Sequence, residues 1–141
     1  MSESDQRLVA LGEELVKLHN GFRHDLAELR AGAEPGPRLG EHCLAFCESL
    51  DLHHRGEEDV LFPHLGERHP ELAQVLDRLS TEHRTVARIL AAIRALVRDG
   101  EPVAVGTELD RLAGELEAHL DYEEEQLVPV LNQLTELPEG L

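Results

Sequence analysis

Two copies of a His-x-x-x-Glu motif are the clearest chemical signal in this sequence. His53 precedes Glu57 by four residues, and His119 precedes Glu123 by the same interval. Side chains four residues apart share one face of an α-helix, so each motif can offer an imidazole and a carboxylate to the same point. Imidazole combined with carboxylate suits iron, manganese, zinc or copper, whereas calcium and magnesium prefer oxygen ligands alone. The motifs therefore predict a transition-metal site.

Both motifs lie within a longer internal repeat. Residues 53–65 align without a gap on residues 119–131, so that a His, several acids, a Leu, a Pro and a final Leu coincide. A second alignment, of His19 on His83, brings the neighbouring apolar positions into register. The repeat predicts a duplicated helix pair with a pseudo-twofold axis, in which each half supplies one single His and one His-x-x-x-Glu motif.

Four apolar stripes with a period near 3.6 residues predict the helices that carry these side chains. Pro63 is expected to bend or end the second helix, because proline removes a helix donor. Thr107 is expected to cap the start of the fourth helix, which fades at Leu137. The stripes cover about residues 4–31, 39–65, 70–98 and 107–134.

Short turns between helices of this length predict an all-α fold, an up-down-up-down antiparallel four-helix bundle. The chain has 141 residues, of which 41% are hydrophobic, and this is the size of one compact domain. We expect residues 1–141 to form a single domain.

Helical geometry sorts the nine histidines. At about 100° per residue, His19 lies near the centre of its apolar stripe, and His24 points to the opposite side. His54 aligns with the core residue Leu120 in the repeat, so it should also face inward, as an additional ligand or a neighbour of the ligands. Surface or capping roles are expected for the histidines outside this register, which are His24, His42, His64 and His69.

Six inward side chains would be costly to bury together, because four imidazoles and two carboxylates would lack partners. A metal supplies that partner. Two half-sites that face each other fit two metals bridged by Glu57 and Glu123. The predicted metal ligands are His19, His53, Glu57, His83, His119 and Glu123. A helical bundle with structural histidines, or one that stores zinc, is the alternative without this chemistry.

The acidic composition excludes several classes of partner. The chain has 13 Lys and Arg against 29 Asp and Glu, and its formal net charge is −16. Such a surface repels phosphate backbones and anionic lipids, so we expect neither nucleic-acid nor membrane binding. The apolar run of a signal peptide and a transmembrane stretch are both missing, which predicts a cytoplasmic protein. Cys43 and Cys47 are expected to be reduced core thiols, and the oligomeric state stays open, with a monomer compatible.

This series of His and Glu residues in a four-helix chain resembles the hemerythrin-like proteins, also called the HHE cation-binding domain family. Residues 57–63 and 123–129 are similar to that family's acidic run before an apolar pair and a proline. The resemblance implies two non-haem iron ions with a bridging oxo or hydroxo group, held by the six ligands above. It also implies reactions with dioxygen, peroxide or nitric oxide.

One position departs from the oxygen-carrying hemerythrins, which have a further ligand histidine one turn after the residue matched by His83. That position is Ala87 here. If His54 does not bind iron, each iron keeps about one open position, which favours peroxide degradation or nitric oxide handling. If His54 does bind iron, one iron has no open position, and the site has the geometry of the oxygen carriers. The hypotheses are a protein that binds these ligands, an oxidoreductase, and a non-catalytic oxygen or iron sensor or metal-storage bundle.

Overall fold

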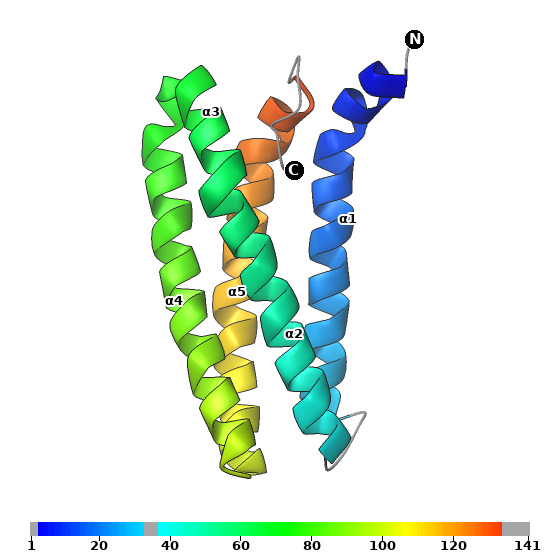
Figure 1. Cartoon of the computed structure of the whole chain (residues 1–141), viewed down its shortest axis with the longest axis vertical. Helices are drawn as coiled ribbons and strands as arrows, with labels where there is room; N and C mark the ends of the chain where they lie inside the picture. The colour runs from blue at the N-terminus through cyan, green and yellow to red at the C-terminus, as the bar shows by residue number, and fades with distance from the viewer. Residues whose placement is uncertain (1–2, 33–36, 134–141) are drawn as a thin grey trace.

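The computed structural model describes residues 3–32 and 37–133, and the side chains of residues 11–32 and 39–133. No β-strand occurs in these ranges, so the all-α prediction is confirmed. The helices form long rods that lie side by side (Figure 1). The elements are α1 (Glu3–Ala31), α2 (Pro37–Gly56), η1 (Glu57–Leu61), α3 (Phe62–Arg68), η2 (Pro70–Leu72), α4 (Ala73–Arg98) and α5 (Pro102–Leu131). Each rod packs against two others, because α1 and α4 both contact α2 and α5.

The second rod contains a turn of π-helix where the sequence predicted a bend or an end at Pro63. The Phe62 N–H donates to the Glu57 carbonyl, five residues back, and this wider turn is η1. Pro63 then lies in the first turn of α3, where its missing N–H costs no helical bond. The rod therefore continues beyond Pro63 to Arg68. Such π-turns occur often at functional sites.

The predicted start of the fourth helix is wrong. The helix α5 begins at Pro102, whose fixed φ and missing N–H suit a first turn. Thr107 lies inside α5, and its Oγ1 donates to the Val103 carbonyl at 3.4 Å instead of capping a terminus. Gly100 has a φ of +71° in the turn before α5, a conformation that favours glycine. The predicted end at Leu137 falls outside the described residues.

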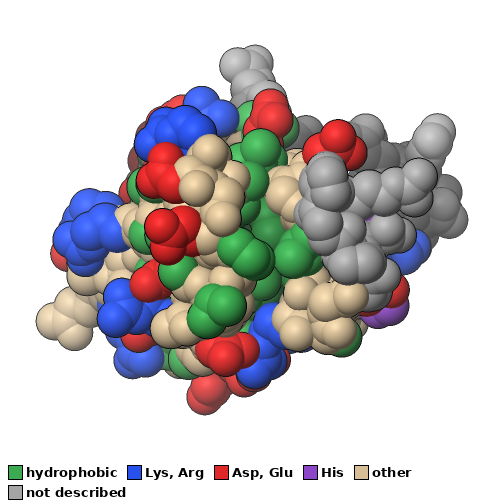
Figure 2. All heavy atoms as spheres, turned by 90° about the horizontal axis from the view of Figure 1, so that it is seen from below, with side chains coloured by type: hydrophobic (Ala, Val, Ile, Leu, Met, Phe, Trp, Pro, Cys, Tyr) green, Lys and Arg blue, Asp and Glu red, His purple; other side chains and the backbone are tan. Residues whose placement is uncertain are grey.

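The apolar core is divided by a polar layer. On α1, His19 lies between the buried residues Leu15 and Phe22, and on α4, His83 lies between Leu79 and Val86. The two apolar parts form separate clusters on either side of this layer. Viewed from one end, apolar side chains gather near the centre of the bundle and charged ones around them (Figure 2). The fold thus places the polar layer within the core.

Candidate metal centre

The structure brings all six predicted ligands together and adds His54. Within the polar layer, two groups of side chains each present ligand atoms within 4.8 Å of one another. Glu57 belongs to both groups, so the two positions for a cation are adjacent. The first ligand group is His54, Glu57, His83 and His119, and the second ligand group is His19, His53, Glu57 and Glu123.

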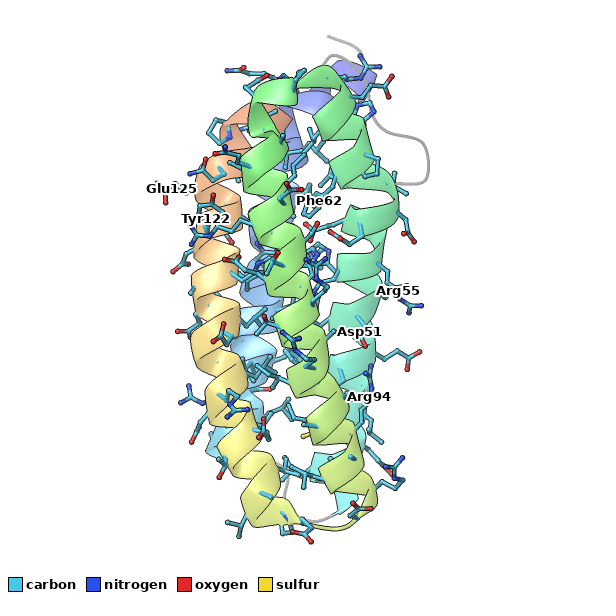
Figure 3. The ribbon with its side chains drawn as sticks, turned by 90° about the vertical axis from the view of Figure 1, so that its left-hand side faces the viewer. Asp51, Arg55, Phe62, Arg94, Tyr122 and Glu125 are labelled. Carbon is cyan, nitrogen blue, oxygen red and sulfur yellow. The ribbon has the colours of Figure 1, made fainter. Side chains whose placement is uncertain are left out.

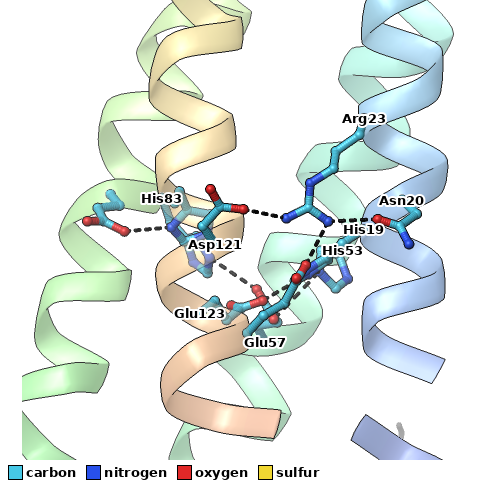
Figure 4. Close-up of polar contacts among 11 residues, drawn as sticks. His19, Asn20, Arg23, His53, Glu57, His83, Asp121 and Glu123 are labelled. Atoms are coloured by element: carbon cyan, nitrogen blue, oxygen red, sulfur yellow. Dashed lines mark hydrogen bonds and ion pairs between the residues drawn. The ribbon is translucent and has the colours of Figure 1, made fainter. Parts of the chain in front are cut away.

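Imidazole nitrogens and carboxylate oxygens approach one another closely in this layer (Figure 4). His19 Nε2 lies 2.9 Å from an oxygen of Glu123. His83 Nε2 lies 3.1 Å from one oxygen of Glu57, and His53 Nε2 lies 3.5 Å from the other. Every ligand side chain is buried except that of His53, which is 12% exposed.

Seven of these buried atoms have no hydrogen-bond partner among the described residues. They are the Nε2 atoms of His54, His83 and His119 and the four carboxylate oxygens of Glu57 and Glu123. Neighbouring atoms are near, but they do not meet at hydrogen-bonding angles. A buried polar atom without a partner costs about 1–3 kcal/mol, and a shared cation that accepts these lone pairs removes that cost. The donor set therefore fits transition-metal ions.

Three of the histidines are held from outside by carboxylates. His19 Nδ1 donates to Glu124 at 2.8 Å, and His83 Nδ1 donates to Glu58 at 3.1 Å. These two contacts are equivalent in the internal repeat. His119 Nδ1 donates to Glu82 at 2.8 Å. A proton on Nδ1 leaves the Nε2 lone pair free to bind a metal.

Two arginines and a serine hold these outer carboxylates in turn. Arg23 donates to Glu124 at 2.8 Å and to Asp121 at 2.9 Å. The long side chain of Arg23 thus reaches the edge of the site from α1. Ser80 donates to Glu58 at 2.7 Å. Finally, Arg78 donates to Glu82 at 3.0 Å and lies 3.6 Å above the ring of Tyr122.

Burial keeps several of the imidazoles neutral. It lowers the pKa of His53 to about 4 and the pKa of His83 to about 3, and neighbouring histidines act in the same direction. Burial also lowers the pKa of His54. Because only a neutral imidazole binds a metal, these residues are ready to bind at neutral pH.

The two carboxylates of the layer differ in charge. Burial and the adjacent Glu123 raise the pKa of Glu57 well above its ordinary value. Burial alone would raise the pKa of Glu123 as well, but the adjacent His19 imidazole and Glu57 carboxyl group lower it. The cation-free layer therefore favours one charged and one neutral carboxyl group, and a bound cation would favour both in the charged form.

His54 makes the two ligand groups unequal. It is only 6% exposed, which confirms the predicted inward orientation. Its ring stacks on that of His83 with centroids 3.9 Å apart. Leu120, the counterpart of His54 in the repeat, is a fully buried core residue. The first ligand group thus has three imidazoles and one carboxylate, and the second has two of each.

Ala87 does not face this layer. Its side chain is exposed on α4. The number of imidazoles therefore depends on His54 and not on the residue at position 87.

The remaining histidines and the cysteines lie outside the two groups. His24 is exposed, as predicted, and its ring lies 3.2 Å from Glu28. His42 is also exposed, His64 is half-buried, and His69 donates to Glu71 at 3.1 Å. Both cysteines are free and buried in the core, which confirms the prediction of packed thiols. These residues are Cys43 and Cys47.

Comparison with known families decides the relationship of this chain. A model of the hemerythrin HHE cation-binding domain matches residues 11–131. The chain belongs to this hemerythrin family. The match covers every residue of both ligand groups, and it confirms the resemblance seen in the sequence. Searches of curated proteins and of solved structures gave no match for this hemerythrin-like chain. Within the described residues, no helix is long and apolar enough to cross a membrane.

Proposed function

We propose that this hemerythrin-like protein is a non-haem di-iron protein that binds dioxygen or a related small ligand, such as peroxide or nitric oxide. The observation that carries the proposal is the pair of ligand groups that share Glu57. Seven unpartnered buried atoms, which belong to His54, Glu57, His83, His119 and Glu123, would be donors to the two cations. The proposed metal ligands are His19, His53, His54, Glu57, His83, His119 and Glu123.

The proposed cofactor is a pair of iron ions with a bridging oxo or hydroxo group. Mixed imidazole and carboxylate donors suit iron, and membership of a cation-binding family supports a resident metal. When bound, iron would supply redox chemistry and open positions for a small ligand. We further propose an up-down-up-down antiparallel bundle, which is supported by the alternating direction of the colour gradient along successive rods (Figure 1).

The protein's own residues would orient and shield the cations. Glu58, Glu82 and Glu124 hold three imidazoles in a fixed tautomer and orientation. Phe22 and Phe62 cover the layer. The ring centroid of Phe22 lies 5.5 Å from that of His53, and the ring centroid of Phe62 lies 5.4 Å from that of His83. Phe62 points into the bundle, whereas Arg55 and Glu125 point away from it (Figure 3). These contacts would exclude water from the cations.

Reversible ligand binding is favoured over peroxide degradation. The position of His54 within the first ligand group supports unequal cations, because one has three imidazoles and the other has two. Open positions would then lie mainly at the second ligand group. This arrangement suits one small molecule held at one cation better than a ligand that bridges two vacancies.

Metal analysis joined to an ultraviolet-visible spectrum tests the proposal. The aerobically purified protein should hold close to two irons per chain and show oxo-to-iron absorption. Nitric oxide added to the reduced protein should give a distinct spectrum that reverses when the gas is removed. One zinc per chain, or no metal and none of these bands, would contradict the proposal. Rapid gas release after peroxide addition would instead favour an enzyme.

A further inference from the structure

A pocket of about 420 Å³ lies between α1 and α2. Its lining includes the buried aromatic rings of Phe22 and Phe46. It also includes the exposed side chains of Asp25, Glu28 and His42. The polar residues therefore form the mouth of this α1–α2 pocket, and the two aromatic rings form its floor.

Phe22 connects the floor of the pocket to the metal centre. Its ring centroid lies 6.1 Å from that of Phe46 and 5.5 Å from that of His53. His53 has the most exposed side chain of the two ligand groups, at 12%. In the described part of the chain, no carboxylate holds its Nδ1, in contrast to His19, His83 and His119. One aromatic ring thus lies between the pocket and the least enclosed ligand.

We propose that the α1–α2 pocket is the access route by which small uncharged molecules reach the second ligand group, and that Phe22 gates this route. The inference rests on the proposed di-iron function and adds the path and its selectivity. An apolar floor suits a molecule such as dioxygen or nitric oxide. The carboxylates of Asp25 and Glu28 at the mouth repel anions, in a chain whose net charge is already −16.

Phe62 offers a matched control for Phe22. Its ring also lies against a ligand histidine, His83, with centroids 5.4 Å apart. Phe62 is 5% exposed and Phe22 is 6% exposed, so the two residues are equally buried. Phe62 does not line the α1–α2 pocket. Truncation of either ring removes similar packing next to an imidazole, but only truncation of Phe22 would open the proposed route.

The first test measures the association rate of nitric oxide with the reduced, iron-loaded protein by stopped flow. Phe22→Leu should raise this rate severalfold, Phe22→Trp should lower it, and Phe62→Leu should raise it much less than Phe22→Leu does. Equal acceleration by Phe22→Leu and Phe62→Leu, or no change in any variant, would overturn the route. Iron content measured beforehand separates this failure from failure of the di-iron function, which would appear as a chain without iron.

Selectivity is tested at the mouth of the pocket. The double variant Asp25→Asn, Glu28→Gln should raise the association rate of azide with the oxidised protein severalfold at low salt. The gain should shrink as salt is added, because exposed charges are screened. The rate for uncharged nitric oxide should not change. An azide rate that is identical in wild type and variant would overturn the proposed exclusion of anions.

A third measurement needs neither iron nor a variant. Dissolved dioxygen is paramagnetic, and it speeds the nuclear relaxation of protons that it approaches. In the zinc-loaded wild-type protein, the ring protons of Phe22 and His53 should relax faster under oxygen than those of Phe62 and His83. Equal effects on the two pairs would overturn the route even if the protein binds iron as proposed.

Discussion

Glu57 and Glu123 occupy matching positions in the internal repeat, yet only Glu57 presents its carboxylate to both ligand groups. The backbone around them differs. Glu57 begins the π-turn η1, whereas Glu123 lies inside the regular helix α5. The duplicated sequence has therefore produced two carboxylates with unequal surroundings.

This inequality predicts different losses of metal from the two glutamate variants. Glu57→Gln should remove both cations, because the residue shared by both groups loses its charge. Glu123→Gln should weaken one cation and leave the other bound. Metal content by mass spectrometry, together with titration of the cation-free protein, measures both effects. Loss of both cations in Glu123→Gln would instead indicate that Glu123 also bridges, as the sequence alone predicts.

The His54→Leu variant places a leucine at position 54, as in the equivalent position 120 of the repeat. It removes one of three imidazoles from the first ligand group, so one cation should bind at least about tenfold more weakly. The second cation should be affected less. His24→Ala is the control, since His24 is exposed and lies in neither ligand group. Unchanged affinity in His54→Leu would show that His54 only packs against His83 and does not bind metal.

The inward histidines could be predicted because each follows the apolar stripe of its own helix. His19 and His83 face the core where the 3.6-residue period places them, and His54 faces inward as its alignment with Leu120 predicts. Helix existence could be predicted for the same reason. The resemblance to the hemerythrin family is confirmed by the matched domain.

Contacts between helices could not be predicted in this way. Glu82 precedes His83 in the sequence but accepts a hydrogen bond from His119 on another helix. Arg23 likewise reaches Glu124 across the gap between α1 and α5. The π-turn at Glu57 was also missed, because a proline signals only a missing donor and not how the preceding turn adapts. Both kinds of feature depend on the packed bundle.

The outer carboxylates predict a matched pair of variants. Glu82→Gln should weaken metal binding by about 10–100-fold, because the His119 imidazole loses the charged group that orients it. Glu125→Gln removes the same charge from an exposed position and should change the affinity little. Titration of the cation-free variants measures both. Equal effects would indicate that net charge, and not the contact with His119, controls affinity.

The cysteine thiols should react slowly in the folded protein. Cys47 is 1% exposed, and burial raises its pKa to about 11. Burial also raises the pKa of Cys43. Because the thiolate is the reactive form, both residues should resist a thiol reagent at pH 8 and react fully in denaturant. Fast reaction of the folded protein would contradict this and indicate that the core around Cys47 opens readily.

Cation removal should make the protein less stable and sensitive to acid. The buried atoms of the ligand groups lose their partner, so the melting temperature at pH 7 should fall when a chelator is added. In the folded cation-free protein, the pKa values of His53 and His83 are about 4 and 3, against an ordinary value of 6.5. The unfolded chain therefore takes up protons first, and these histidines contribute stability above pH 6.5 that is lost as the pH falls toward 3.

Glu57 acts in the opposite direction, since its raised pKa favours the folded state at low pH. The stability lost through the lowered pKa values of His53, His54 and His83 should exceed the stability gained from Glu57 as the pH falls. Urea unfolding of the cation-free protein between pH 7 and pH 4 measures how the free energy of unfolding declines with pH. His53→Ala should make the decline shallower, whereas His24→Ala should leave it unchanged because His24 is exposed. A free energy of unfolding equal at pH 7 and pH 4 would show that these imidazoles already bind protons in the folded, cation-free state.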